Sequence, residues 1–383
     1  MNWRTVRLEE ICEINMGKTP SRNNLNYWGG TNSWVSIADL KGEVYINKTK
    51  ECITDEGIKV SGIKSVPPNT LLYSFKLSIG KVAITNKIIY TNEAIVALPI
   101  LDTNKLDLKY FYWAMQVVNI SGIGDKAVMG LTLNKEKLKQ LQIPLPPLPV
   151  QQRIAAILDA ADALRRKDRE LLKKYDELAQ AIFIDMFGDP VKNEKGWETV
   201  NLGNLTEISS GSTPSRSDEK NFFGSIPWVK TGEVNGRIIL ETEEKISENA
   251  LKKSSCKLYP SGSIIVAMYG QGKTRGQVGL LGITATTNQA CAVLPPNDNI
   301  NFKYLYNLLK LLYNDLRSLG RGGNQPNLNA GLLKNYHIIN PPIFLQDKFV
   351  ERIQLIEKQK ELKEETLIKS EKLFQVLIKR NFN

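Results

Sequence analysis

Two stretches of the chain carry apolar residues at the three- and four-residue spacing of a helix that buries one face. The first runs from about residue 150 to residue 188, where Gly188 is typical of a helix end. The second runs from about residue 345 to residue 383 and is polar in its middle. At about 1.5 Å per residue, each helix would be roughly 55 Å long. The predicted apolar seams are Ile154, Ile157, Ala161, Leu164, Leu171, Tyr175, Leu178 and Ile182 in the first helix, and Phe349, Ile353, Ile356, Leu367, Phe374 and Leu377 in the second.

A single helix with such a seam would expose a long apolar stripe to water. The two helices are therefore expected to bury their seams on each other. A pseudo-twofold axis between them would make them antiparallel. The basic centre of the first helix, at 165–169, would then meet the acidic Glu361, Glu364 and Glu365 of the second.

The segments before each helix have a different pattern. Short runs rich in β-formers, separated by Gly, Pro and Asn, are typical of strands. Clear examples are Thr70–Phe75, Lys81–Thr85 and Ser263–Met268. One helical stretch per segment is expected, near 108–118 and 302–316. The fold class is therefore α+β, with mixed α/β domains built on largely antiparallel sheets.

The chain is an internal repeat with an offset of about 194 residues. Trp3 to Arg22 reads WRTVRLEEICEINMGKTPSR, and Trp197 to Arg216 reads WETVNLGNLTEISSGSTPSR. Later matches include Trp34-Val35 with Trp228-Val229 and Pro146-Pro147 with Pro341-Pro342. A repeat of this length is a whole domain rather than a solenoid unit. The predicted order is a domain at 1–149, a helix at 150–188, a second domain at 189–344 and a second helix at 345–383, with the two domains separated by the helix pair.

The charge of the chain favours an anionic partner. Lys plus Arg is 51 and Asp plus Glu is 40, so the net charge is +11. Residues 1–149 hold 18 basic and 13 acidic side chains, and residues 188–344 hold 17 and 13. Most of the positive excess is therefore on the two globular segments, which fits nucleic acid, an anionic surface or an acidic partner.

Several kinds of catalytic site are disfavoured by composition. His337 is the only histidine, which argues against a Ser-His-Asp triad or a multi-histidine zinc site. The four cysteines, Cys12, Cys52, Cys256 and Cys291, form no Cys-x-x-Cys pair and are expected to be free thiols in a reducing cytosol. No metal site is predicted. No leader-like or membrane-spanning apolar run is visible, so a cytoplasmic protein without membrane contact is expected.

Two motifs resemble catalytic ones. The segment from Ala267 to Thr274 approximates a P-loop, but the glycines that follow Lys273 do not favour the helix that a phosphate-binding loop requires. A basic strand-to-strand loop is expected instead. Asn340-Pro341-Pro342-Ile343 resembles the amide-Pro-Pro-aromatic motif of adenine methyltransferases, with Ile343 in place of the aromatic ring. A rigid connection into the second helix is expected there, and His337 is expected to be a strand residue without a catalytic role.

The polar loops that remain are the candidate DNA-binding elements, because they combine hydroxyls, flexible backbone and basic or amide side chains. The candidates in the first half are Lys18, Thr19, Ser21, Arg22, Lys76 and Lys126; those in the second are Thr213, Ser215, Arg216, Lys230, Gln271, Lys273, Arg275, Arg321, Asn324 and Gln325.

These features together resemble a known family over essentially the whole chain. They are the duplicated Gly-x-Thr-Pro-Ser-Arg openings, the Ile143–Ile154 segment (IPLPPLPVQQRI) before the first helix, and the Met186–Pro190 segment (MFGDP) after it. The family is the specificity subunit of type I restriction–modification systems. The second helix departs from the pattern, since Gln346 is followed by Asp347-Lys348 rather than by a second Gln and Arg.

The resemblance implies that each globular segment is a target recognition domain that reads one half of an asymmetric bipartite DNA site. It further implies that the helices separate the half-sites and bind two modification (methyltransferase) subunits, which are joined by restriction/translocase subunits. Catalysis, S-adenosylmethionine, ATP and magnesium would belong to those partners, and this chain would hold no catalytic residue and no cofactor. The implied partner-binding residues are Gln151, Gln152, Arg153 and Gln346.

Two other function classes remain open at this point. A standalone DNA adenine methyltransferase would be active without partners. A tandem protein-binding scaffold would not show the steep loss of DNA binding with salt that phosphate contacts produce.

Overall fold

The structure is a computed structural model that describes residues 3–118, 120, 125–127, 130–270, 272–320 and 327–382. It contains two compact units. Unit 1 comprises Met1–Arg169 together with Glu365–Asn383, and unit 2 comprises Glu170–Glu364. Each unit therefore holds one globular part and a segment of each long helix.

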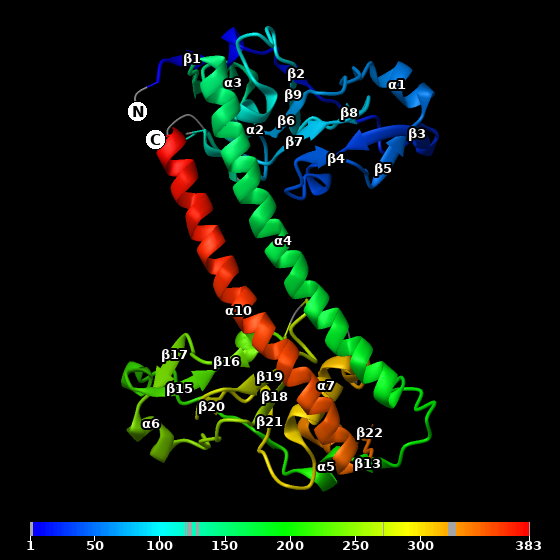
Figure 1. The fold of residues 1–383 in the computed structure, drawn as a ribbon, viewed down its shortest axis with the longest axis vertical. Coiled ribbons are helices and arrows are strands. Elements are labelled where there is room, and N and C mark those ends of the chain that lie inside the picture. The colour runs from blue at the N-terminus through cyan, green and yellow to red at the C-terminus, as the bar shows by residue number, and fades with distance from the viewer. Residues whose placement is uncertain are drawn as a thin grey trace. The chain divides into compact units, whose positions relative to one another are not determined.

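The globular part of unit 1 is built on a five-stranded and a three-stranded sheet (Figure 1). The larger sheet has the order β2 (Asn15–Met16), β9 (Ile95–Leu98), β6 (Leu71–Ser74), β7 (Val82–Thr85), β4 (Tyr45–Ile46), and the smaller has β5 (Glu51–Ile53), β3 (Trp28–Val35), β8 (Tyr90–Thr91). Strand pairs β4–β7 and β3–β8 are parallel, and the other pairs of both sheets are antiparallel. Two further pairs are β1 (Thr5–Arg7) with β12 (Gln142–Pro144) and β10 (Asp125–Ala127) with β11 (Gly130–Thr132).

Unit 2 repeats this topology, which confirms the internal repeat at the level of strand order. Its larger sheet has the order β14 (Ser209–Ser210), β21 (Cys291–Leu294), β18 (Ile264–Ala267), β19 (Val278–Leu281), β16 (Ile238–Ile239), and its smaller sheet has β17 (Glu244–Ile246), β15 (Ile226–Val229), β20 (Thr286–Thr287). Strand β13 (Thr199–Asn201) pairs with β22 (His337–Ile339) as β1 does with β12. His337 is thus an exposed strand residue.

The central strands are buried on both faces, which explains their nearly continuous apolar sequence. In β6, Leu71 and Tyr73 join one core, and Leu72 between them joins a second core on the opposite face. Helix α2 (Leu108–Val117) packs into the first of these cores. In unit 2, α7 (Phe302–Leu311) packs against β18 in the same way, and α8 (Tyr313–Ser318) follows it. Both predicted helical stretches are therefore present.

The expectation of one helix per globular segment was too low. In the described residues, five short α-helices accompany α2 and α7–α8: α1 (Asp55–Ser61), α3 (Lys135–Lys139), α5 (Leu202–Leu205), α6 (Glu248–Lys253) and α9 (Ala330–Lys334). Most begin at a side-chain cap; Thr54 Oγ1 accepts from the Gly57 amide at 3.1 Å, and Ser247 Oγ from the Ala250 amide at 3.1 Å. A helix of one or two turns is too short to give a recognisable hydrophobic periodicity in the sequence. Only its capping residue indicates where it begins.

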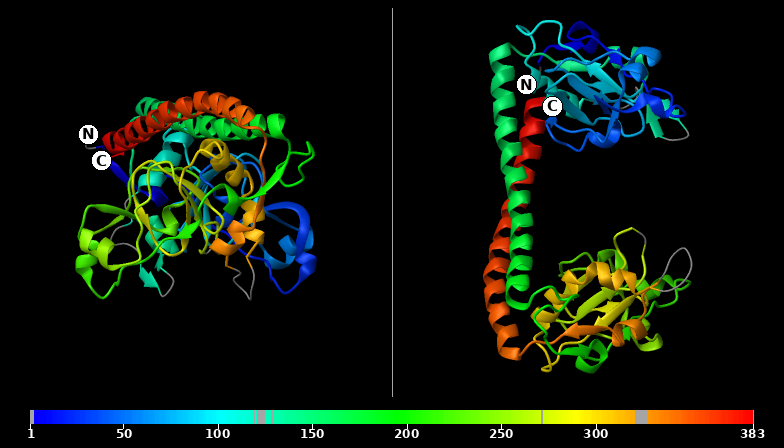
Figure 2. Two further views of the ribbon diagram at one scale, coloured as in Figure 1. Left: turned by 90° about the horizontal axis from the view of Figure 1, so that it is seen from below. Right: turned by 90° about the vertical axis from the view of Figure 1, so that its right-hand side faces the viewer.

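The two long helices are α4 (Leu148–Phe187) and α10 (Ile343–Phe382). The right-hand view of Figure 2 shows their segments side by side within each unit, along the globular part. In unit 1, Phe374 packs with Trp113 of α2 at 5.5 Å between ring centroids, in a core that also contains Ile154 and Leu158 of α4. In unit 2, Phe183 of α4 lies 5.3 Å from Phe349 of α10. Phe183 also stacks on Tyr304 of α7 at 5.6 Å between ring centroids, so aromatic contacts tie both helices to the globular parts.

The helices run antiparallel within each unit, as expected, but in a different register. In unit 1, Arg165 contacts Glu371 at 3.3 Å and Arg169 pairs with the same carboxylate. In unit 2, Lys360 pairs with Asp176 at 2.5 Å. The prediction that the basic centre of α4 meets Glu361, Glu364 and Glu365 is therefore wrong, because packing against the globular cores sets the register.

The predicted seam was also partly wrong. Ile157, Leu164 and Leu178 are 38%, 46% and 47% exposed and lie outside the buried face. The buried face of α4 instead includes two carboxylates, Asp162 and Asp168. Asp162 accepts charge-assisted bonds from Arg165 and Arg166, and Asp168 accepts from Ser370 of α10 at 3.3 Å. Among the described helices, none has the length of apolar sequence that a bilayer crossing requires.

Candidate nucleic-acid interface

The duplicated Gly-x-Thr-Pro-Ser-Arg segment has the same backbone contacts in both units. We call residues 17–22 and 211–216 the TPSR loops. The Lys18 amide donates to Thr91 O at 2.9 Å, and the Ser212 amide donates to Thr287 O at 2.9 Å. Each loop is thus attached to the last residue of the parallel strand β8 or β20. The sequence identity of the two openings is therefore explained by a shared structural role.

The glycine that opens each TPSR loop lies too close to that strand for any side chain. A Cβ atom on Gly211 would overlap Thr287 O, Thr287 Oγ1 and Asn288 O, and one on Gly17 would overlap Thr91 and Asn92 in the same way. The loop can approach the strand only because these positions lack a Cβ.

Replacing Gly211 with alanine should therefore destabilise unit 2 by at least about 1–3 kcal/mol, the usual cost of overpacking a tight site. Denaturant unfolding followed by circular dichroism would measure the change. Gly232→Ala is the matched control, because nothing lies within 4 Å of the position of its Cβ. Equal stability of the two variants would contradict the close packing described here.

The arginine that ends each TPSR loop is held by aromatic rings and a carboxylate. The Arg22 guanidinium carbon lies 3.7 Å from the Trp28 ring centroid and 4.9 Å from that of Trp34. Its two terminal nitrogens donate to the two carboxylate oxygens of Glu51 at 2.5 and 3.0 Å. This geometry combines a cation–π stack with a bidentate ion pair.

Unit 2 repeats the arrangement with one changed ring. The Arg216 guanidinium carbon lies 4.1 Å from the Phe222 centroid and 5.1 Å from the Trp228 centroid, and its Nη1 donates to Glu244 at 2.7 Å.

Hydrogen bonding from Arg216 is the main reason that the pKa of Glu244 lies below its ordinary value of 4.5, as bonding from Arg22 is for Glu51. Both pairs are therefore expected to weaken as the pH falls below that value and the carboxylates become protonated. We call these two clusters the arginine stacks: Arg22, Trp28, Trp34 and Glu51 in unit 1, and Arg216, Phe222, Trp228 and Glu244 in unit 2.

An open recess of about 520 Å³ adjoins the arginine stack of unit 2. Its lining consists of Thr213, Arg216, Trp228, Lys230, Thr231, Gly232, Glu233, Glu243, Asn288 and Gln289. Three of the predicted DNA-binding residues, Thr213, Arg216 and Lys230, are thereby brought together. Lys230 Nζ also pairs with Glu243 at 2.7 Å and with Glu244 at 3.1 Å.

The corresponding positions of unit 1 keep the backbone contacts of this recess but carry different side chains around its opening. We call these positions, 230, 243 and 289 in unit 2 and 36, 50 and 93 in unit 1, the rim. Glu233 accepts from the backbone amides of Lys230 and Glu243, and Asp39 accepts from those of Ser36 and Lys50. The aligned side chains, however, change in charge: Ser36 stands for Lys230, Lys50 for Glu243 and Glu93 for Gln289. Thr19 donates to Glu93 where Thr213 donates to Gln289.

The glycine-rich segment between β18 and β19 is a strand-to-strand loop, as predicted. No helix begins at Lys273, and Gly270, Gly272 and Gly276 all have positive φ. The loop is fixed from α8, where Tyr313 donates to Lys273 O at 2.7 Å and Arg317 to Arg275 O at 2.9 Å. This conformation lacks the helix N-terminus that would hold a nucleotide phosphate.

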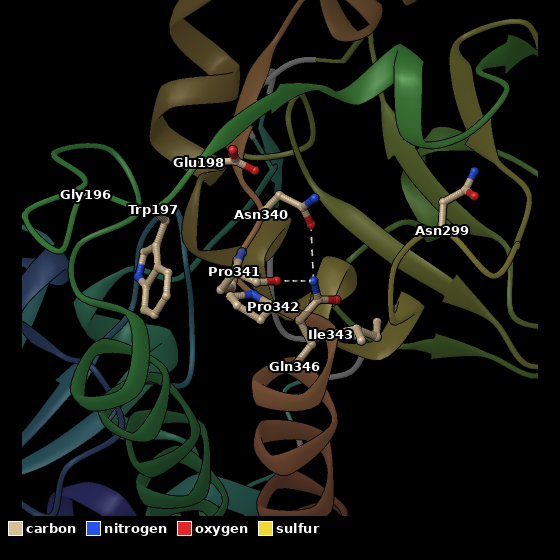
Figure 3. A pocket seen from close by; sticks show the side chains of 9 residues that line it. All are labelled: Gly196, Trp197, Glu198, Asn299, Asn340, Pro341, Pro342, Ile343 and Gln346. Carbon is tan, nitrogen blue, oxygen red and sulfur yellow. Dashed lines mark hydrogen bonds between the residues drawn. The ribbon is translucent and has the colours of Figure 1, made fainter.

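The Asn-Pro-Pro-Ile segment lines a pocket of about 440 Å³ at the start of α10 (Figure 3). The Gln346 amide nitrogen donates to Asn340 Oδ1 at 3.2 Å and to Pro341 O at 2.8 Å, the two dashed lines of the figure. The backbone N–H of Asn340 donates to the backbone oxygen of Glu198 at 2.8 Å. The asparagine is thus used to fix the chain where the helix begins, and Ile343 offers no ring for base stacking.

Gln346 and its repeat counterpart Gln151 are internal clamps rather than partner contacts. Gln151 is fully buried, and its Oε1 accepts from the backbone N–H of Asp107 at 2.9 Å. In the same way, Gln346 Oε1 accepts from the backbone N–H of Asn301 at 2.9 Å. Asp107 and Asn301 are the N-caps of α2 and α7. Each glutamine therefore ties a long helix to the globular part, and of the four predicted partner residues only Gln152 and Arg153 are exposed.

The other predicted residues are spread over both units. Lys18 and Ser21 are exposed, as are Ser215 and Lys273, whereas Lys76 and Arg275 are half-buried. Gln271, Arg321, Asn324, Gln325 and the side chain of Lys126 lie outside the described residues. The carboxylates and rings of the arginine stacks were missed, because they come from other parts of the sequence. The four cysteines are free thiols, and the described residues hold no group of three or more His, Cys, Asp or Glu side chains suited to a metal.

Comparisons with known proteins give a consistent result. The family model for the type I restriction modification DNA specificity domain matches residues 1–174 and again 194–371. The MjaIX type I restriction enzyme specificity subunit of Methanocaldococcus jannaschii is 29% identical over 381 residues, covering 93% of this chain and 87% of that protein. The EcoR124I/EcoR124II specificity subunit of Escherichia coli is 27% identical over 266 residues, covering 65% and 63%.

Solved structures show the same fold. The S subunit of the type I restriction-modification system from M. genitalium superposes with a TM-score of 0.62 at 17% identity, covering 100% of this chain and 96% of that one. A chain from a study of complex assembly in the type I system gives a TM-score of 0.57 at 18% identity, with 100% and 97% coverage.

Proposed function

Since the chain belongs to the type I restriction–modification DNA specificity family, we propose that it reads a bipartite double-stranded DNA site with one globular part per half-site. Specificity subunits are the non-catalytic DNA-recognition component of these systems. The globular parts of units 1 and 2 would be the two target recognition domains. A protein that acts on DNA in this way is expected to be cytoplasmic.

The observation that carries this proposal is the contrast between a duplicated framework and a divergent rim. Both units keep the TPSR loop, the arginine stack and the strand order. At the rim, side chains that can bond base edges differ in charge, as with Ser36 and Lys230. Because base edges are distinguished by donor and acceptor patterns, two such surfaces would read different sequences. The half-sites are therefore expected to differ, which makes the whole site asymmetric.

The long helices are the proposed docking surface for partner subunits, with one modification subunit on each unit. In unit 1, Leu164 of α4 and Val376 of α10 are 46% and 60% exposed. In unit 2, Leu355 and Leu362 of α10 are 72% and 51% exposed. Exposed apolar side chains that recur along a helix are typical of protein interfaces. The exposed Gln152 and Arg153 would border this surface in unit 1.

Replacing Leu355 with aspartate should weaken the binding of a modification subunit at unit 2 by at least about tenfold, because a charge would be buried in an apolar contact. Analytical ultracentrifugation of the mixed subunits would show fewer subunits bound per chain. Glu351→Asp, one helical turn earlier and also exposed, is the control. Full binding by the Leu355 variant would place the docking surface elsewhere.

The chemistry is proposed to reside entirely in partner subunits. The two motifs that resemble catalytic ones have structural contacts instead: Tyr313 donates to Lys273 O in the glycine-rich loop, and Gln346 donates to Asn340 Oδ1 at the start of α10. S-adenosylmethionine would then be bound by the modification subunits, and ATP and magnesium by the restriction/translocase subunits. No residue of this chain is assigned to any of them.

The test is to map methylated bases in cells that carry the whole system and in cells that lack only this chain. We expect one bipartite motif to be methylated in the first and unmethylated in the second. Methylation that persists without this chain, or that falls on an undivided motif, would refute the proposal.

A further inference from the structure

We propose that Arg22 and Arg216 are positioning residues, which fix the TPSR loops in the conformation that meets DNA and do not themselves bind phosphate. This inference rests on the proposed DNA-reading function. It changes the role of two residues whose sequence context suggested direct contact.

Each arginine is already paired with a carboxylate inside its own unit. Arg22 places one face of its guanidinium against Trp28 and directs two terminal nitrogens to Glu51. Its side chain is 51% exposed, and that of Arg216 is 53% exposed. A phosphate that approached either arginine would meet the neighbouring carboxylate, and like charges at that distance repel. The stacks are therefore poor phosphate sites despite their exposure.

The backbone carbonyl of the residue before each arginine is also hydrogen-bonded inside its own unit. Trp28 Nε1 donates to Ser21 O at 3.1 Å, and Asn221 Nδ2 donates to Ser215 O at 3.0 Å. The donors differ in the two units, yet the same carbonyl of the loop is fixed. A contact that is kept by different side chains indicates that the loop conformation is what both units require.

The first part of each TPSR loop is also fixed by a hydrogen bond to its backbone. The indole nitrogens of Trp34 and Trp228 donate to the backbone oxygens of Lys18 and Ser212 at 3.1 and 3.0 Å. These two tryptophans are also rings of the arginine stacks. In unit 1 the rings of the arginine stack thus fix both ends of the TPSR loop, whereas in unit 2 Trp228 fixes one end and Asn221, the neighbour of Phe222, fixes the other. The exposed Lys18 remains as a candidate phosphate contact, whereas Lys230 is held by Glu243 and Glu244 and is disfavoured on the same ground as Arg216.

The decisive variant is Glu51→Gln, because the two roles predict different results: weaker discrimination between sequences in one case and tighter DNA binding in the other. If Arg22 positions the loop, losing its ion-pair partner should lower discrimination at one half-site about tenfold, equal to about 1.4 kcal/mol. If Arg22 binds phosphate, its release from Glu51 should raise DNA affinity instead. The assembled complex would be incubated with random-sequence duplexes, and the bound DNA would be sequenced to score each half-site separately.

Glu56→Gln is the matched control, since it removes the same charge from an exposed position of α1. We expect it to leave both half-sites unchanged. Arg22→Lys serves as the second variant, in case Glu51→Gln lowers the melting temperature of the complex. Lysine keeps the charge but cannot make the bidentate, stacked contact, so it should lose discrimination as well.

Salt dependence provides an independent readout. The slope of log affinity against log salt on a mixed-sequence duplex should stay the same in Arg22→Gln, whereas loss of a phosphate contact would reduce it by about 0.9. A reduced slope, full recognition by Arg22→Lys, or tighter binding by Glu51→Gln would each overturn the inference. If the wild-type complex selects no motif at all, the proposed function fails instead.

Discussion

Exchanging residues 1–149 for the corresponding segment of a relative with another specificity should replace one half of the recognised DNA motif and leave the other half unchanged. The physical reason is that each globular part has its own sheets and its own rim. Changes in discrimination of a single base pair are worth about 1–3 kcal/mol, so a replaced half-site should differ by several orders of magnitude in selectivity. Mapping the methylated motif of cells that carry the hybrid would measure this.

The reciprocal exchange of residues 189–344 is the control and should alter only the other half-site. The hybrids need the residues that clamp the long helices, notably Trp113 and Asp107 in the first segment and Tyr304 in the second. If one exchange altered both halves of the motif in a folded protein, the two units would not read DNA independently.

Removing one heptad from both long helices should shorten the spacer between the half-sites without changing the bases read. Residues 167–173 of α4 and 364–370 of α10 are suitable, because they lie along each helix between the pair Arg165–Glu371 of unit 1 and the pair Asp176–Lys360 of unit 2. Seven residues at about 1.5 Å shorten a helix by about 10.5 Å. That length equals about three base pairs of DNA at about 3.4 Å each.

The deletion keeps the anchors on either side of it, the pairs Arg165–Glu371 and Asp176–Lys360. Replacing the same two heptads by seven other helix-forming residues, without deletion, is the control and should leave the spacer length unchanged. A shortened protein that folds, assembles and still methylates the original motif would show that the helices do not set the spacing.

The parts of the fold that could be predicted are those encoded locally or by repetition. The strand runs such as Ser263–Met268 and the long helices follow from periodicity, and the repeat required that both globular parts share one topology. The phase of the helix seam could not be predicted, because α4 carries apolar residues on more than one face. Ile157 and Leu164 fit a heptad as well as Ile154 and Ala161 do, yet only the latter pair meets the core.

The position of the candidate interface could be predicted from the sequence, but the roles of its individual residues could not. The TPSR loops were recognised from their repetition, and Thr213, Arg216 and Lys230 do line one recess. The role of Arg22 depends on Glu51, which lies 29 residues further along the chain, and on rings from β3. The family resemblance likewise implies a partner contact for Gln151, which would require a surface position. Only the fold shows that it bonds the backbone at Asp107.

The composition of unit 1 has a consequence for the order of events during synthesis. Its core includes Phe374, which packs on Trp113, and Phe382, which packs on Tyr110. These late residues leave the ribosome only after all of unit 2, residues 170–364, has been made. At about 5–20 residues per second, the first globular part waits roughly 10–40 s with this apolar surface uncovered. During that interval the nascent chain would be a natural substrate for chaperones, and unit 2, whose segments are contiguous, would be the first to complete its core.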